Sequence, residues 1–171
     1  SVSGDAQAEN ACARAIYEEL LQVEPLHGHT FTVNEIDCEG DALNRKSVLG
    51  LLRSGKKTAR TILLTGHFDV VDTQDCGVLS QLAFDPEAYM AEIGHHPISK
   101  DARLDWESGN WLFGRGVMDM KAGLAIFIEA IKKLAQDPDL NINLAFLAVP
   151  DEESNSAGMR GAMKAFVEMI N

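Results

Sequence analysis

The sequence predicts an α/β protein in which helices pack against a layered sheet. Two apolar runs, 61–66 and 141–149, have the length and composition of buried strands. In 5–23 and 119–136, apolar residues recur every three or four positions, which is typical of helices that cover a sheet with one face. No repeat or change in composition indicates a second domain, so we expect residues 1–171 to lie within one domain.

The shorter strands are predicted from alternation and from breaking residues. Residues 29–36 alternate through Phe31 and Val33, as a half-buried strand does. A short polar segment separates the apolar runs 47–52 and 61–66. This arrangement predicts a hairpin or another tight connection between these two strands.

The stretch 72–110 is polar, and we expect it to be irregular except for one helix. That helix is predicted to begin at Pro86, because Asp85 is a favourable N-cap and proline is favoured at the first helical position. Residues 110–114 predict a short strand, and a last helix is expected from Ala157 onward.

The composition argues against several classes of function. The chain has 26 acidic and 15 basic residues and a formal net charge of −11, whereas nucleic-acid-binding proteins present basic surfaces. No apolar run approaches the roughly 18 residues of a membrane-spanning helix, and no signal peptide is visible. We therefore expect a cytoplasmic protein that binds neither nucleic acid nor a membrane. Its cysteines form no C-x-x-C pair and are expected to be small buried thiols: Cys12, Cys38 and Cys76.

A histidine and several carboxylates follow the predicted buried strands. His67 and Asp69 come directly after 61–66, and three acidic residues at 151–153 come directly after the other strand. Asp119 follows a glycine-rich turn at the start of a predicted helix. Functional groups gather at the carboxyl ends of strands in open α/β sheets, so we expect these residues to meet. Imidazole and carboxylate together suit zinc, cobalt or manganese.

Each part of this group has a second interpretation, and for Asp119 it is a helix N-cap preceded by flexible glycines. His67 would bind a metal ion through one ring nitrogen, while Asp69 accepts the N–H of the other and fixes the tautomer. The alternative is a plain hydrogen bond between the two side chains. Glu152 and Glu153 would repel each other if buried without a cation; the alternative is an acidic helix N-terminus favoured by the helix dipole. The other histidines lie in irregular segments and are expected to be exposed to solvent: His27, His29, His95 and His96.

Three segments, GHFDVV (66–71), GRGVMDMKAG (114–123) and VPDEESNSAGM (149–159), resemble the signature segments of the co-catalytic zinc peptidases and deacylases. This family includes acetylornithine deacetylase, succinyl-diaminopimelate desuccinylase, aminoacylase and glutamate carboxypeptidase, and the three segments occur in the family's order. The flanking residues 64–92 and 106–116 look most like the RocB-type arginine-utilisation branch.

The resemblance implies a fold and a set of roles. The fold would be a three-layer, zinc-peptidase-like catalytic domain with a mixed sheet flanked by helices. The cofactor would be two divalent metal ions, zinc in the first place, with cobalt or manganese as alternatives. His67 would bind one ion, Asp119 would bridge both, and Glu153 would bind the second. Glu152 would be the general base, and Asp69 would orient the histidine.

The implied activity is metal-dependent hydrolysis of an amide bond in a small peptide or an acylated amino acid, with a role in arginine utilisation. An acetylornithine-type deacetylase is an alternative. A truncated homologue that serves as a binding or assembly module without catalysis is another. The resemblance further implies a non-proline cis peptide bond between Asp119 and Met120.

The family pattern also includes two further ligands and an inserted lid domain, which residues 1–171 do not supply. The resemblance therefore implies that the chain is the truncated N-terminal part of the catalytic domain, and that the lid or dimerisation domain and the C-terminal part are absent. We expect this chain to bind metal weakly and not to turn over substrate alone, and the full-length protein to form a homo-oligomer. The added residues between His67 and Asp119 are expected to cover the mouth of the site or to form a subunit contact.

Overall fold

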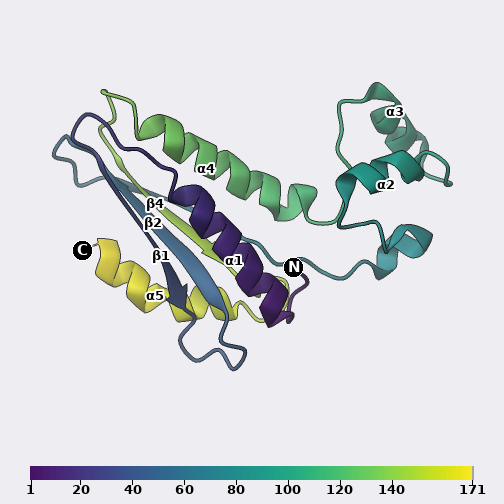
Figure 1. Ribbon diagram of the computed structural model, residues 1–171, viewed down its shortest axis with the longest axis horizontal. Coiled ribbons are helices and arrows are strands. Elements are labelled where there is room, and N and C mark those ends of the chain that lie inside the picture. The colour runs from purple at the N-terminus through teal and green to yellow at the C-terminus, as the bar shows by residue number, and fades with distance from the viewer. Residues whose placement is uncertain (171) are drawn as a thin grey trace.

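The computed structural model describes residues 1–170 and contains a mixed four-stranded sheet between two layers of helices (Figure 1). α1 and α4 cover one face of the sheet, and α5 covers the other. This three-layer arrangement confirms the predicted fold class. In chain order the elements are α1 (Ala6–Leu20), β1 (Thr30–Asp37), β2 (Lys46–Arg53), β3 (Thr61–His67), η1 (Gln74–Leu79), α2 (Pro86–Ile93), α3 (Lys100–Ser108), η2 (Val117–Ala122), α4 (Gly123–Leu134), β4 (Asn143–Val149) and α5 (Ala157–Ile170).

The strands are ordered β1-β2-β4-β3, with β3 parallel to β4 and the other neighbouring pairs antiparallel. The connection between β2 and β3 is short, residues 54–60, as predicted, but the two strands do not form a hairpin, because β4 lies between them. β4 is buried along its whole length and belongs inside the sheet, whereas β3 exposes Ile62 and Leu63 and lies at its edge. Two short apolar runs in the sequence do not show which strands pair with each other. The antiparallel hairpin is formed by β1 and β2.

Two apolar clusters hold the three layers together. Leu20 of α1, Ile131 of α4 and Phe146 of β4 are completely buried in the first cluster. Leu147 of β4 and Phe166 of α5 belong to the second, on the opposite face of the sheet. Because each large apolar side chain contributes about 1.5–3 kcal/mol when it is fully buried, the core depends most on β2 and β4, the two strands that supply residues to both clusters.

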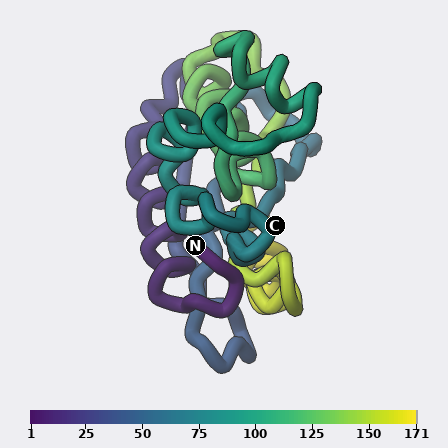
Figure 2. Tube along the Cα trace, turned by 90° about the vertical axis from the view of Figure 1, so that its right-hand side faces the viewer, coloured from purple at the N-terminus to yellow at the C-terminus, as the bar shows by residue number. Residues whose placement is uncertain are grey.

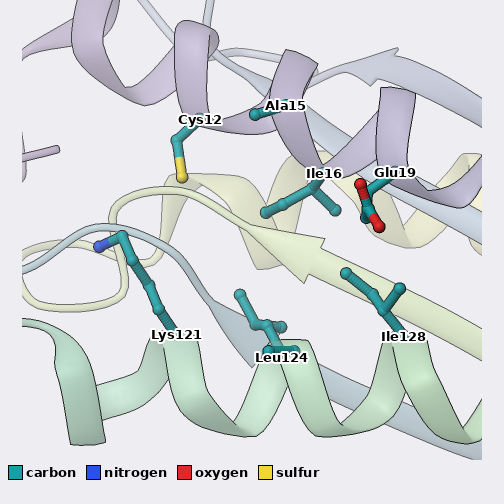
Figure 3. A pocket seen from close by; sticks show the side chains of 8 residues that line it. Cys12, Ala15, Ile16, Glu19, Lys121, Leu124 and Ile128 are labelled. Carbon is teal, nitrogen blue, oxygen red and sulfur yellow. The ribbon is translucent and has the colours of Figure 1, made fainter. Parts of the chain in front are cut away.

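The two helices on one face of the sheet lie side by side. A groove of about 250 Å³ runs between them (Figure 3). Cys12 and Ile16 line it from α1, and Leu124 and Ile128 line it from α4. The floor of this groove is apolar because the same two helices cover the first cluster of the core.

The cysteines match the predicted state only in part. All three are free thiols. Cys38 is buried, as expected, but Cys12 and Cys76 are only partly buried.

Two local predictions are wrong in residues 110–122, the segment that precedes α4. The helix predicted from residue 119 begins at Gly123, because Asp119 and Met120 in the preceding irregular turn η2 have non-helical backbone angles. No strand forms at 110–114, where Trp111 and Leu112 are exposed. A strand needs a neighbouring strand for its main-chain hydrogen bonds, and this segment runs back from the lobe without one.

Residues 72–110 form a lobe that projects from the sheet (Figure 1), and Figure 2 views the molecule from the side of this lobe. The helix predicted to begin at Pro86 is present as α2, and Asp85 caps it. α3 was not predicted, although Ser99 caps its first turn and Gly109 ends it in a left-handed conformation. The expected irregular stretch is therefore more helical than its polar composition indicates. None of the helices within residues 1–170 is long and apolar enough to cross a membrane.

Candidate metal centre

The carboxyl ends of β3 and β4 bring the predicted ligands together. These strands are parallel, and His67 pairs with Val149 in their register, so the turn after β4 begins beside His67. Glu153 lies in that turn, and Asp119 reaches the same edge of the sheet from η2. His67, Asp119 and Glu153 each offer one ligand atom, and these three atoms all lie within 4.8 Å of one another.

The ring of His67 faces oxygen atoms at both nitrogens. Nδ1 lies 3.0 Å from the main-chain carbonyl oxygen of Asp69, and Nε2 lies 3.0 Å from Oδ1 of Asp119. A carbonyl oxygen can only accept a hydrogen bond, so Nδ1 donates to Asp69, and Nε2 of the neutral ring keeps its lone pair. This lone pair faces a carboxylate. A cation between the two groups would stabilise that arrangement.

Asp69 supports the site in a different way from the predicted one. Its carboxylate oxygen Oδ1 is 3.6 Å from Nδ1 of His67, which is farther than its own carbonyl oxygen. The carboxylate is completely buried and accepts hydrogen bonds from the main-chain N–H groups of Glu152 and Glu153, at 3.0 and 3.1 Å. Asp69 thus orients the imidazole mainly through its main chain and holds the two glutamates through its side chain.

The two glutamates have different surroundings. Glu153 is partly buried and contributes a ligand atom to the group with His67 and Asp119. Glu152 is more open to solvent, with 53% of its side chain exposed, and its Oε2 is 3.8 Å from Nε2 of His67. Glu152 therefore lies beside the three candidate ligands, and its carboxylate is open to solvent.

The third carboxylate after β4 does not join the site. Asp151 is buried, has a left-handed backbone conformation with φ 67°, and directs its side chain toward Arg45. Its Oδ1 is 2.6 Å from Nη1 of Arg45. The expectation that all three acidic residues at 151–153 meet at the site is wrong for Asp151, because a buried guanidinium neutralises this carboxylate on the other side of the turn.

Sequence patterns do not identify Arg45 as part of this region, because it follows a polar loop and resembles a surface residue. Glu9, which lies 3.4 Å from Arg45, did give a signal. It lies on the same helical face as the buried residues Ala13, Ile16 and Leu20. A carboxylate in the apolar stripe of a helix indicates a buried cationic partner elsewhere in the chain.

The glycine-rich segment before Asp119 fits closely against the residues that follow β3. Gly116 has φ 77°, and a Cβ at this position would lie 2.7 Å from Cγ1 of Val70, so a larger residue would displace the segment that leads to Asp119. The peptide bond between Asp119 and Met120 is cis, as the resemblance implies. A cavity of about 300 Å³ opens beside this segment, and Arg115, Asp119 and Glu153 are among its lining residues.

Residues 63–171 match the sequence profile of peptidase family M20/M25/M40. The chain belongs to this family. The M20-family chain is 41% identical to the uncharacterised protein YqjN of Bacillus subtilis over 174 residues, which cover 99% of this chain and 30% of YqjN. It is 31% identical to the protein RocB of the same organism over 120 residues, 70% of this chain and 21% of RocB. A succinyl-diaminopimelate desuccinylase of Acidovorax ebreus is 36% identical over 107 residues, 61% of this chain and 22% of that enzyme.

Solved structures agree with the family in fold. The M20-family metallo-carboxypeptidase Sso-CP2 of Sulfolobus solfataricus superposes with a TM-score of 0.64 and 19% identity, over 100% of this chain and 32% of that one. LapB of Legionella pneumophila gives a TM-score of 0.60 and 14% identity, over 98% of this chain and 35% of that one. The M20-family chain therefore spans about a third or less of the length of these relatives.

The donor set of this M20-family chain fits a divalent cation. One imidazole nitrogen and two carboxylate oxygens are ligands that zinc, cobalt and manganese accept. Within residues 1–170, His67, Asp119 and Glu153 are the one group of three such donors close enough to share an ion. The lone pair of His67 and the carboxylate that faces it supply the physical reason for a cation at this place.

Proposed function

We propose that the chain carries the metal-binding part of a hydrolase that cleaves an amide bond in a small peptide or an acylated amino acid. The observation that carries this proposal is the meeting of His67, Asp119 and Glu153, whose ligand atoms come from distant segments and lie within 4.8 Å of one another. Membership of peptidase family M20/M25/M40 supports the hydrolytic class of reaction.

His67, Asp119 and Glu153 would hold a divalent ion, which supplies a Lewis acid for the amide carbonyl and lowers the pKa of water. We propose zinc, with cobalt or manganese as alternatives, because the donor set has both a nitrogen and carboxylate oxygens. Asp119 is the residue suited to bridge a second ion, since 76% of its side chain is exposed beyond His67. The three donors within residues 1–170 are few for two ions, so we expect this chain alone to bind metal weakly.

Glu152 is the proposed general base. Its carboxylate lies beside the ligands without being held by them, 3.8 Å from Nε2 of His67. From there it would take a proton from the attacking water and return it to the leaving amine, a transfer that contributes about 10²–10⁴-fold to a rate. Asp69 fixes the position of this base, because its carboxylate accepts the main-chain N–H of Glu152.

The identity with succinyl-diaminopimelate desuccinylases, 36% over 107 residues in one of them, favours a deacylase of an N-acylated amino acid over a general peptidase. The identity with RocB, 31% over 120 residues, is the reason to include arginine-derived substrates, among them acylated ornithine. A binding or assembly module without catalysis is the competing proposal. The position of Glu152 beside the ligands speaks against it, since binding alone does not need a base there.

A cobalt titration tests the proposal directly. The chain should bind Co²⁺ with a visible absorption spectrum that the variants His67→Ala and Glu153→Ala lose. The exposed Glu168→Ala on α5 is the matched control and should bind as the wild type does. Equal Co²⁺ binding by all four proteins would contradict the site. An intact enzyme that binds metal there but hydrolyses none of a panel of N-acyl amino acids and dipeptides would favour the binding module.

A further inference from the structure

A buried group of charges lies directly beneath the turn that carries Glu152 and Glu153. Arg45 is its centre, and it forms ion pairs with Asp41 at 2.9 Å, with Asp151 at 2.6 Å and with Glu9 at 3.4 Å. None of these four side chains is more than 5% exposed. One guanidinium therefore joins α1, the connection between β1 and β2, and the turn after β4.

The same group also fastens the main chain of the turn. The N–H of Asp151 donates to Oε1 of Glu9 at 3.0 Å. Oδ2 of Asp151 accepts the N–H of Ala157, the first residue of α5, also at 3.0 Å. The turn is thus held at its beginning and at its end by two carboxylates, and both of these carboxylates face Arg45.

We propose that Arg45 is a positioning residue for the Glu152–Glu153 turn: by holding Asp151 and Glu9 it keeps Glu153 within reach of His67 and Glu152 beside it. The part of this inference that concerns metal rests on the proposed function. Arg45 itself does not touch the group of His67, Asp119 and Glu153, so it acts only through the turn.

The charges of the group support the proposal that Arg45 holds the turn. Hydrogen bonds from Arg45 lower the pKa of Asp41 to about 2. Asp151 is held by hydrogen bonds from Arg45 at 2.6 Å and from the Ala157 N–H at 3.0 Å. Burial raises the pKa of Glu9, whose partner Arg45 is farther away. Arg45 is the cation shared by all three, so its loss would leave three buried carboxylates without a cation and would remove one of the anchors of the turn.

A general stabilising role makes a different prediction from a positioning role. A residue that only stabilises the fold would lower the stability of the whole molecule and leave the turn unchanged in the folded state. A positioning residue loosens the turn while the sheet stays intact. Amide hydrogen exchange distinguishes the two, because it reports local opening separately from global unfolding.

The decisive experiment compares Arg45→Met with the wild-type chain in the absence of metal. Amides of 151–157 should exchange at least about tenfold faster in the variant, while the amides of β4 keep their protection. Arg103→Met is the matched control, because Arg103 is a partly buried arginine of the lobe that donates to the carbonyls of Gly94 and His96. Its effect should stay within the lobe.

A second variant covers the case in which Arg45→Met does not fold. Arg45→Lys keeps the charge but cannot reach all three carboxylates at once, so the same amides should exchange faster by a smaller factor. A folded variant of either kind with a turn that exchanges as slowly as in the wild type would overturn the proposal.

Metal binding then tests the consequence for the site. In a Co²⁺ titration, Arg45→Met should bind about 10- to 100-fold more weakly than the wild type, as variants of groups behind metal ligands do. Arg103→Met should bind normally. Fast exchange of the turn combined with normal Co²⁺ binding would overturn the link to the site. If the wild type bound no Co²⁺, the proposed function would fall, while the exchange comparison would still decide whether Arg45 holds the turn.

Discussion

Two histidines of this molecule are equally buried, yet only one belongs to the proposed metal centre. His29 and His67 each expose 6% of their surface, and they lie at opposite ends of the sheet. Nδ1 of His29 accepts the N–H of Gly55 at 2.7 Å, and its Nε2 lies 2.8 Å from the carbonyl oxygen of Asp137. The ring of His67 faces two acceptors instead.

A neutral imidazole has one donor and one acceptor. The surroundings of His29 supply one partner of each kind, so this ring is satisfied by the protein alone. The surroundings of His67 supply two acceptors, so one nitrogen is left for a cation. The chemistry of the partners, rather than burial, distinguishes His67, the proposed metal ligand, from His29. The expectation that His29 is exposed was wrong for the same reason, because main-chain partners can bury a histidine that no sequence pattern marks.

The largest expected effect separates catalysis from metal binding at the His67 end of the sheet. In the intact enzyme, Glu152→Gln should lower kcat by about 10²–10⁴-fold, because the proton acceptor is lost. Metal affinity should stay unchanged, since Glu152 lies beside the ligands without belonging to them. Steady-state kinetics and a Co²⁺ titration measure the two quantities. Loss of metal in this variant would show that the roles of Glu152 and Glu153 are exchanged.

The next effect tests the comparison of the two histidines directly, through Co²⁺ binding. His67→Gln should weaken Co²⁺ binding by more than about 100-fold, since even groups behind the ligands change affinity by 10- to 100-fold. His29→Gln should leave Co²⁺ binding unchanged. Similar losses in both variants would mean that the metal does not distinguish the two rings.

For the free energy of unfolding the order is reversed: replacing His29 should have a larger effect than replacing His67. His29→Leu should lower the free energy of unfolding by about 2–4 kcal/mol, because the N–H of Gly55 and the carbonyl of Asp137 both lose their partner. Urea denaturation followed by circular dichroism measures this change. His67→Leu in the metal-free protein should lower it less, because one of its two contacts is between acceptors.

The smallest effect concerns the charged group on the His67 side of the molecule. The hydrogen bonds from Arg45 hold the pKa of Asp41 at about 2, below the usual value of 3.8. A lowered pKa stabilises the folded protein above the unfolded value, and this contribution is lost as the pH falls from about 4 to about 2. It amounts to about 1–2 kcal/mol.

Urea denaturation at about pH 5 and about pH 2 measures this contribution, with Asp41→Asn as the comparison. The pH dependence of the variant should be weaker by this amount. If the variant and the wild type lost the same stability on acidification, the ion pair with Arg45 would not be the cause.

The ligands of the proposed site could be found in the sequence because each one stands beside a local signal. His67 ends one apolar strand, Glu153 follows another, and Asp119 follows a glycine-rich turn. Their meeting required only that these strands be parallel neighbours, which the structure confirms.

What could not be predicted depends on partners that are distant in the chain. The local sequence of β2 and β3 does not predict that β4 lies between them, because the pairing of two strands depends on the residues of both partners. Arg45 and Asp151 are 106 positions apart, and each alone resembles a solvated charge. The hydrogen bonds from the N–H groups of Glu152 and Glu153 to the Asp69 carboxylate could not be predicted either. Every residue except proline has a main-chain N–H, so the sequence does not indicate which one a carboxylate will accept.

The strand order has a consequence for biosynthesis. β4, which lies between β2 and β3, is the last of these four strands to leave the ribosome. At about 5–20 residues per second, the two earlier strands wait several seconds for their shared neighbour, with apolar faces uncovered. β2 and β3 can therefore pair with this shared neighbour only after translation has passed residue 149.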